Sequence, residues 1–210
     1  MNWNEHSNLK GMHAKFSPSQ SAWIRYDLDG MFEKYNKSFA TSIGTILHSY
    51  AEDRIQSSMK MTKSQKNDII FELLRNGIPS SAVEGLNIDS LFGTLYSYVN
   101  DSISLKMRPE QILFYSPIFF GTTDAIRFVK NKLFIFDLKT GETPAHMDQL
   151  LIYAALFCLE YEFHPVDIDI ELRIYQLNEA IIHKPEASEI VPIMDHIIMS
   201  NKFFEREGGH

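Results

Sequence analysis

The chain has 210 residues, of which 44% are hydrophobic and 22% charged, so it is long enough for one domain with a sizeable core. Its net charge of −7 argues against a protein that coats nucleic acid by bulk electrostatic attraction. No apolar run approaches the ~18–20 residues of a membrane span, and the start of the chain lacks an apolar signal core. We therefore expect a cytoplasmic protein with no membrane partner.

Four helices are predicted in the first half of the chain. Ser17 as the N-cap, followed by Pro18 at the first helical position, predicts a helix that continues through SQSAWIRYDLDGMFEKY. Hydrophobic periodicity predicts three more helices. They cover 42–61, then 63–76 up to a stop at Gly77-Ile78-Pro79, then 88–101 in spite of Gly93 inside it. The helical part of the chain is expected at about 17–103.

In the second half of the chain the sequence predicts mostly strands. Runs rich in aromatic and β-branched residues predict strands at 112–120, 124–129 and 133–138. A strong helix is expected after Thr143-Pro144, up to about Glu162. IDIELRIYQL and AIIHK then suit a hairpin, and EIVPIMDHIIMSNKFF suits a closing helix. The sheet core is thus expected at about 110–184, and the pattern alone predicts the α+β class.

The single cysteine, Cys158, restricts the kinds of stabilisation and cofactor that the chain can use. One cysteine excludes an internal disulfide framework and an iron–sulfur cluster held by four cysteines. Its neighbours in LLIYAALFCLEY are apolar, which predicts a position in the core. The last three residues, 208–210, suit remaining tag sequence, so we expect one domain over 1–207.

Charged residues appear abruptly at the ends of two predicted apolar strands. In LFIFDLK, Asp137 and Lys139 share one face because side chains alternate along a strand, and Leu138 points into the core. Asp124 lies thirteen residues before Asp137, and the hairpin turn that VKNKL suits would bring it close to both. A bare D-x-K is usually an exposed ion pair of little consequence. The apolar approach and the second acid favour a functional site.

Two acids and a lysine in this arrangement suit the hydrolysis of a phosphodiester. The reaction needs a deprotonated water, neutralised phosphate charge and help for the leaving oxygen, and one or two hard cations supply most of this. Mg²⁺ prefers carboxylate oxygens and retained waters, which suits Asp124 and Asp137. Lys139 is placed to orient or deprotonate the water, or to stabilise the oxyanion. An ammonium beside two acids keeps its proton without metal, so its role as a base stays open.

These elements resemble the PD-(D/E)XK nuclease superfamily, in particular its RecB-type and lambda-exonuclease-like branch. Asp124 in GTTDA fits the G-x-x-D element of that family, and Asp137 and Lys139 fit the (D/E)-x-K element. Gln149 and Tyr153 in QLLIY fit the Q-x-x-x-Y element on the following helix. By resemblance, Gln149 would hold the active-site end of that helix and contact DNA phosphate or the catalytic strand, whereas the apolar neighbours of Tyr153 also suit a core residue.

The resemblance extends upstream and downstream of the strands. GTILHSYAE fits the G-x-x-x-H-x-x-x-E helix with His48 and Glu52, and HAKFSPSQSAWIRY, from His13, resembles the LSPS segment of phage and bacterial members. IDIELRIYQL suits the strand that follows in the family. The resemblance therefore covers about 13–153 and implies a restriction-endonuclease-like αβββαβ core, a mixed sheet flanked by helices.

The resemblance also implies a set of metal ligands. These are His48, Asp124, Asp137 and the backbone carbonyl of Leu138, around one or two Mg²⁺ or Mn²⁺ ions. An imidazole ligand would shift the preference toward Mn²⁺. Glu52 lies one turn after His48, where it could orient the imidazole, contact a second ion or cap a solvated face.

The expected function is metal-dependent hydrolysis of DNA, by an exonuclease of phage-recombination or repair type. DNA is then the main partner, with an annealing protein or helicase as a recombination partner, in a bacterial or phage-infected cell. An endonuclease or structure-specific nuclease on the same core is the alternative among enzymes. A second alternative, which is not an enzyme, is a catalytically silent DNA-binding or assembly module, although the intact acids, lysine and histidine argue against it. The third alternative is an α+β domain that binds a ligand.

Overall fold

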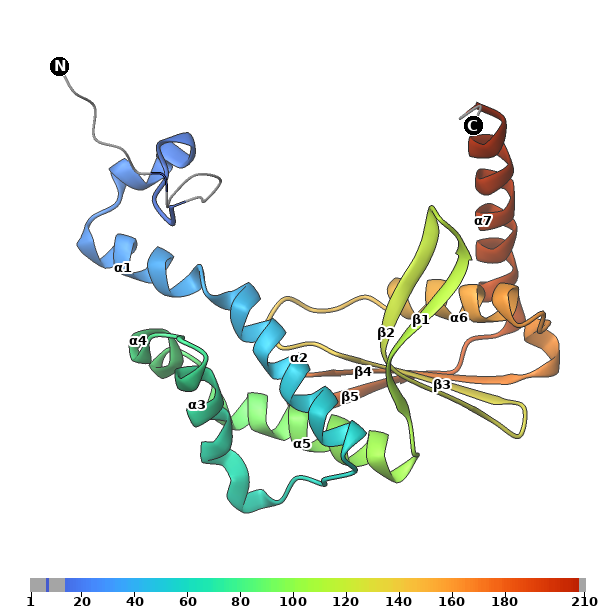
Figure 1. Cartoon of the computed structure of the whole chain (residues 1–210), viewed down its shortest axis with the longest axis horizontal. Coiled ribbons are helices and arrows are strands. Elements are labelled where there is room, and N and C mark those ends of the chain that lie inside the picture. Colours follow the sequence, from blue (N-terminus) through green and yellow to red (C-terminus); the bar gives the residue numbers. More distant parts are fainter. Residues whose placement is uncertain (1–6, 8–13, 208–210) are drawn as a thin grey trace.

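The computed structural model describes residue 7 and residues 14–207, and Figure 1 shows the path of the chain. His13, the first residue of the segment that resembles LSPS, lies outside the described residues. The expected tag at 208–210 lies wholly outside them. Helices occupy the first half of the chain and a sheet dominates the second. In chain order the elements are η2 (Pro18–Arg25), α1 (Leu28–Lys37), α2 (Ala40–Gln56), η3 (Lys63–Gln65), α3 (Lys66–Arg75), α4 (Ser80–Glu84), α5 (Ile88–Ser104), β1 (Arg108–Ser116), β2 (Phe119–Val129), β3 (Lys132–Leu138), α6 (Asp148–Glu160), η4 (Pro165–Asp167), β4 (Asp169–Gln176), β5 (Glu179–His183) and α7 (Ala187–Glu207).

Five strands form one open mixed sheet in the order β1-β2-β3-β4-β5. The first three strands are an antiparallel meander, and β4 and β5 are an antiparallel hairpin. β3 and β4 run parallel, which requires a crossover connection, and α6 supplies it. The α+β class that the sequence predicts is confirmed, as is the hairpin at the end of the sheet.

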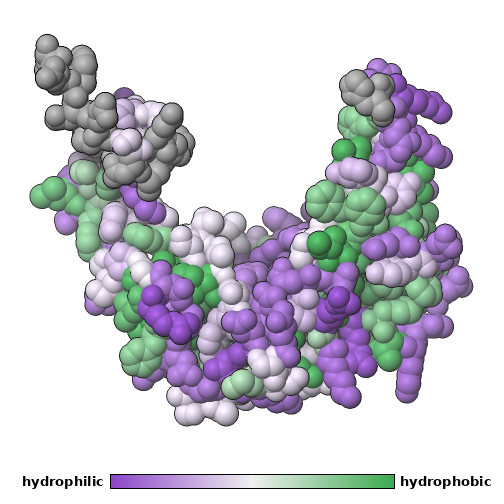
Figure 2. Space-filling view, in the orientation of Figure 1, coloured by the Kyte–Doolittle hydropathy of each residue, from purple (hydrophilic) through white to green (hydrophobic). Residues whose placement is uncertain are grey.

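Helices cover both faces of the sheet. On one face α2, α3 and α5 bury a core that includes Leu47, Leu73 and Leu95 together with Phe136 and Leu138 of β3. On the other face α6 and α7 bury a second core. In the space-filling view the molecule is concave, with a hollow between the arm that carries α1 and the end of α7 (Figure 2). Among the described residues no helix is both long and apolar enough to cross a membrane.

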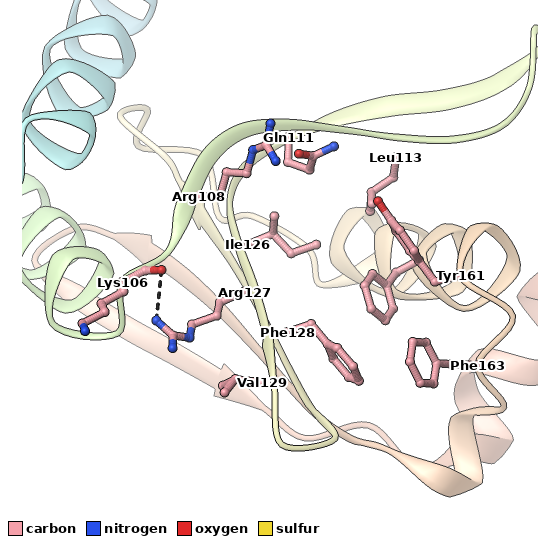
Figure 3. Close-up of a pocket in the computed structure, with 11 residues that line it drawn as sticks. Lys106, Arg108, Gln111, Leu113, Ile126, Arg127, Phe128, Val129, Tyr161 and Phe163 are labelled. Atoms are coloured by element: carbon pink, nitrogen blue, oxygen red, sulfur yellow. Dashed lines mark hydrogen bonds between the residues drawn. The ribbon is translucent and has the colours of Figure 1, made fainter.

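An aromatic cluster closes the second core at the C-terminal end of α6. The rings of Phe157 and Phe163 stack with centroids 5.7 Å apart, and Phe128 of β2 lies 4.7 Å from Phe163 (Figure 3). Cys158 is buried in the same core, and burial raises the pKa of its thiol to about 11. The predicted core position of Cys158 is confirmed.

The single helix predicted from Ser17 is wrong, because the segment is broken into two. Pro18–Arg25 is 3-10 helix, and α1 begins only at Leu28. Between them the side chain of Asp27 accepts a hydrogen bond from the backbone N–H of Gly30 at 2.8 Å. An aspartate that can satisfy a free N–H in this way favours a new helix start over continuation of the preceding one.

Other predicted boundaries also need correction. The strand predicted at 112–120 is wrong, since the chain turns between Ser116 and Phe119, and Phe114 pairs with Phe120 across the resulting hairpin. Pro117 falls in this turn because it cannot donate a hydrogen bond to a ladder. The helix predicted at 42–61 ends at Gln56, and the helix expected after Pro144 begins only at Asp148.

The β1–β2 hairpin twists strongly at the level of Glu110 and Asp124. Gly121 faces α6 and Ile126 packs into the core under the same helix, although the two lie five positions apart. Residues an odd number apart on a regular strand point to opposite faces, so the alternation is broken between them. Glu110 has a left-handed φ of 49° at this point. The distal half of the hairpin therefore leaves the plane of the sheet (Figure 1).

Gly93 inside α5 is explained by close approach of the β4–β5 turn. A Cβ atom at position 93 would lie 1.8 Å from the Oδ1 atom of Asn178 and 2.5 Å from its Cγ atom. Asn178 has a φ of 64°, and its backbone N–H donates to the Thr94 hydroxyl at 2.7 Å. The helix and the turn therefore touch at a point where a side chain at position 93 would displace the side chain of Asn178.

We predict that Gly93→Ala lowers the free energy of unfolding by about 1–3 kcal/mol, although alanine is the better helix former. Asn178→Gly removes the opposing side chain and tolerates the left-handed backbone. In that background Gly93→Ala should be neutral or stabilising. Denaturant unfolding of the four proteins measures the coupling, and an equal loss in both backgrounds would contradict this contact.

Candidate active site

Two carboxylates face each other across β2 and β3. The ladder pairs Ala125 with Phe136, and one step further along the same register Asp124 comes opposite Asp137. The hairpin predicted from VKNKL therefore forms, and it places these two acids together as expected. Lys139 follows the end of β3 and shares the face of Asp137.

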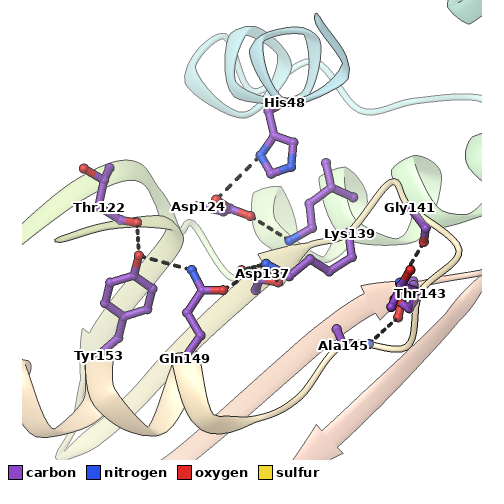
Figure 4. Close-up of polar contacts among 12 residues, drawn as sticks. His48, Thr122, Asp124, Asp137, Lys139, Gly141, Thr143, Ala145, Gln149 and Tyr153 are labelled. Atoms are coloured by element: carbon purple, nitrogen blue, oxygen red, sulfur yellow. Dashed lines mark hydrogen bonds and ion pairs between the residues drawn. The ribbon is translucent and has the colours of Figure 1, made fainter. Parts of the chain in front are cut away.

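Asp124 is held by a backbone group and faces a histidine. Its Oδ2 atom accepts a hydrogen bond from the backbone N–H of Leu138 at 2.7 Å, so the link runs from β2 to β3. Its Oδ1 atom lies 3.6 Å from the Nδ1 atom of His48, which α2 projects toward the strands (Figure 4). The Leu138 side chain is buried, as predicted. The expected role of its carbonyl as a metal ligand remains a prediction.

Asp137 is a buried acid, with a side chain only 4% exposed. Burial raises its pKa to about 6, and the charge of Asp124 adds to the rise, while Lys139 opposes it. The Nζ atom of Lys139 lies 2.9 Å from Oδ2 and donates a hydrogen bond to Oδ1 at 3.0 Å. In spite of that short distance, Oδ2 accepts no hydrogen bond of acceptable geometry. Asp137 thus retains a buried oxygen available to a further cation.

Lys139, Gln149 and Tyr153 form a chain of polar contacts across the site. Lys139 donates to the Oε1 atom of Gln149 at 2.9 Å, and the Nε2 atom of Gln149 lies 3.4 Å from the Tyr153 hydroxyl. That hydroxyl donates to the carbonyl of Thr122 at 2.6 Å (Figure 4). The first turns of α6 are thereby tied to β2 and to the lysine.

Two glycines of the quoted motifs lie where other parts of the chain approach closely. A Cβ atom at Gly121 would lie 2.9 Å from the ring of Tyr153, which leaves no room for a side chain between β2 and α6. A Cβ atom at Gly44 would lie 3.3 Å from the hydroxyl of Thr140, just after Lys139. The glycines therefore let α6 and α2 approach the strands that carry the acids.

Gln176 was not predicted as a site residue, yet it fixes the loop that carries the site. Its buried amide donates to the carbonyls of Gly141 and Thr143, both at 2.7 Å, and accepts from the N–H of Ala145 at 3.0 Å. The loop from β3 to α6 is therefore clamped between Lys139 and Gln149. Polar and apolar residues alternate in IDIELRIYQL, and the signal in the sequence is that Gln176 occupies a position where the alternation expects an apolar residue.

An open cavity of about 470 Å³ adjoins Asp124. His48, Glu52 and Asp124 line it, as does Glu110, which the sequence analysis missed. Burial raises the pKa of Glu110, and the charges of Asp124 and Glu52 add to the rise while His48 opposes it. Glu52 accepts a hydrogen bond from Gln56 at 2.7 Å, and its three predicted roles, as orienter of the imidazole, ligand of a second ion or cap of a solvated face, remain predictions. No pattern marked Glu110, because its place follows from the twist of the hairpin.

The charge of His48 depends on the acids around it. Burial by itself lowers the pKa of the imidazole, but the hydrogen bond and charge of Asp124, together with Asp137, outweigh it. Lys139 reduces this effect, and the net pKa is raised above 6.5. The acids of the site therefore favour the protonated form of this imidazole.

The carboxylates and the imidazole of this site are ligands that suit a hard divalent cation, although they are not arranged as a preformed metal site. Among the described residues no group of three or more histidine, cysteine, aspartate or glutamate side chains is arranged to hold a metal ion. The buried Oδ2 atom of Asp137 accepts no hydrogen bond, although the Lys139 ammonium lies 2.9 Å away, and the Oδ1 atom of Asp124 lies 3.6 Å from His48. Asp124, Asp137 and His48 are therefore the residues that would hold such an ion.

Comparisons with known proteins leave the family open. No protein-family model matches the sequence, and no curated protein matches it either. Any functional assignment therefore depends on the motifs and on the geometry of the site.

We predict that Asp137→Asn stabilises the metal-free protein at pH 8 by about 1–3 kcal/mol. The folded-state pKa of about 6 lies above the ordinary value of 3.8, so above pH 6 only the native state holds a disfavoured buried charge. As the pH falls from 6 to about 4 the native carboxyl takes up a proton, and the difference between the two proteins disappears.

Urea unfolding of both proteins at pH 8 and pH 4 measures this change. Asp195→Asn, at an exposed acid of α7, is the control and should change little at either pH. A loss of stability in Asp137→Asn at pH 8 would show that its contacts hold the carboxylate more strongly than burial disfavours it.

Proposed function

We propose that this protein is a divalent-metal-dependent deoxyribonuclease with a PD-(D/E)XK site. The observation that carries the proposal is the pair Asp124 and Asp137, opposite each other at the end of the β2–β3 ladder, with the Lys139 ammonium 2.9 Å from the buried acid. His48 approaches the same pair from α2. The residues named from the motifs thus meet in space, although they come from four segments of the chain.

The topology supports the same proposal. Helices precede an antiparallel β1–β2–β3 meander, and α6 then crosses over to a β4 strand parallel to β3. This order agrees with the αβββαβ core expected of the restriction-endonuclease-like fold. The acids lie on the second and third strands of the meander and the lysine directly follows the third, as the G-x-x-D and (D/E)-x-K elements require.

In this proposal Asp124, Asp137 and His48 hold one or two Mg²⁺ or Mn²⁺ ions. A bound ion lowers the pKa of a water and neutralises phosphate charge. The Lys139 ammonium, which lies between Asp137 and Gln149, donates hydrogen bonds to the phosphate oxygens or positions the attacking water. Gln149 and Tyr153 position Lys139, because their contacts link it to the Thr122 carbonyl.

Action at DNA ends is the form of the activity we favour. It follows from the RecB-type motifs at His48, Gln149 and Tyr153, with an annealing protein or helicase as the recombination partner in the cytoplasm. Because a chain of net charge −7 holds DNA by few cationic contacts, the salt dependence of its activity should be shallow, in proportion to the number of phosphates contacted.

The test is incubation with Mg²⁺ or Mn²⁺ and either linear or covalently closed circular DNA. We expect short products from linear DNA only, and no cleavage by Asp124→Ala or Asp137→Ala, because each removes a metal ligand while the fold survives. Asp148→Ala, at an exposed acid of α6, is the matched control and should cleave normally. Cutting of closed circles would favour the endonuclease alternative. Cleavage by Asp137→Ala near the wild-type rate would reject the site, and an inactive wild type would favour the silent module.

We predict that Lys139→Ala keeps metal binding but loses about 10²–10³ in turnover, the usual cost of removing one positioned donor to the developing negative charge. Calorimetric titration with Mn²⁺ and single-turnover cleavage measure the two properties separately. Lys130→Ala, in the exposed β2–β3 turn, is the control. Loss of metal binding in Lys139→Ala would contradict the role assigned to the lysine.

A further inference from the structure

A second hollow of about 440 Å³ lies beyond the C-terminal end of α6, on β1 and β2, the second of which carries Asp124. Its floor is aromatic, with Phe128, Tyr161 and Phe163 directed toward it, and its rim is cationic, with Lys106, Arg108 and Arg127 (Figure 3). We call this hollow the α6-end groove. Its volume lies in the range of small-ligand sites.

The rim of the groove is positively charged in a chain whose net charge is negative. No acidic side chain lines the groove. Across the part of the chain that the structure describes, none of its three cations forms an ion pair. Arg127 is fixed in place, because its guanidinium donates to the carbonyls of Leu105 and Lys106 at the end of α5. The groove therefore attracts an anion.

The floor presents aromatic surface that is held rigidly. Tyr161 is 47% exposed, and its ring lies 4.9 Å from that of Phe157, which is part of the aromatic cluster under α6. Phe128 and Phe163 pack against the same cluster. Rings fixed by their neighbours lose little side-chain freedom when a ligand stacks on them.

The groove and the candidate site lie on the two sides of one hairpin. On β1, Glu110 of the site cavity lies in sequence between Arg108 and Gln111 of the groove. On β2, Asp124 of the site cavity precedes Ile126 of the groove by two residues. At about 3.3 Å per strand residue, Arg108 is only about 7 Å from Glu110 along β1. A chain molecule that passes over the strand can therefore reach both.

We propose that the α6-end groove binds a short single-stranded segment of DNA, with a base against Tyr161 and phosphates against Lys106 and Arg108. Aromatic rings with nearby cations are the common means of holding single strands without sequence preference. The proposal rests on the proposed function and adds to it a substrate class, DNA with a single-stranded extension. An acidic peptide would satisfy the same charges, but the neighbouring phosphodiester-type site favours nucleic acid.

The test measures binding of the full chain to a fluorescent single-stranded oligonucleotide by anisotropy, without divalent metal and over a range of salt. Lys106→Ala/Arg108→Ala should weaken binding about 10-fold or more and flatten the salt dependence, because phosphate contacts release counterions. Tyr161→Ala should weaken binding about 5–20-fold and leave the salt dependence unchanged, because stacking involves no net charge. Lys63→Ala/Lys202→Ala, two exposed lysines outside the groove, is the charge-matched control and should bind like the wild type.

The outcomes separate this proposal from the nuclease assignment. If both groove variants bound the oligonucleotide with wild-type affinity, the proposed DNA-binding role of the groove would be wrong, even if metal-dependent cleavage were present. If both variants bound it more weakly, that role would be supported, even if the wild type failed to cleave DNA. A synthetic peptide of alternating aspartate and phenylalanine is the competitor. If the groove variants weakened only peptide binding, the occupant would be a protein segment and the proposal would be wrong.

Discussion

The structure around the site depends on two like charges placed opposite each other with little water. Asp124 and Asp137 meet at the end of the β2–β3 ladder, and the second is almost fully buried. Burial and mutual repulsion both disfavour two ionised carboxylates, which is why the pKa of Asp137 rises to about 6. A site of this kind is stable only with nearby cations or hydrogen-bond donors, and the surrounding elements supply them.

The compensating groups come from parts of the chain that are far apart in sequence. α2 brings His48, the backbone of Leu138 donates to one acid, and the loop after β3 brings Lys139. The loop is held in turn by Gln176 of β4 and by Gln149 of α6. The same contacts that offset the acid pair therefore fix the geometry that phosphodiester chemistry would need.

The twist of the β1–β2 hairpin gives these strands two uses. It turns Glu110 toward the cavity beside His48. The groove lined by Arg108 and Tyr161 lies on the other side of the hairpin. Since the left-handed φ of Glu110 coincides with the break in alternation, one local distortion separates an acidic surface from a basic aromatic one. The acidic chain thus carries a small basic surface close to the acid pair without being broadly basic.

The sequence by itself determined the α+β class, the order of the main elements and the hairpin that joins Asp124 to Asp137, because these follow from local periodicity and turn chemistry. Gly93 and the broken helix after Ser17 show its limits. Whether a glycine is needed or a helix continues depends on what approaches from elsewhere in the chain. Only the tertiary structure decided that Glu110 joins the cavity, since its placement results from a twist between paired strands, and strand pairing is a non-local interaction.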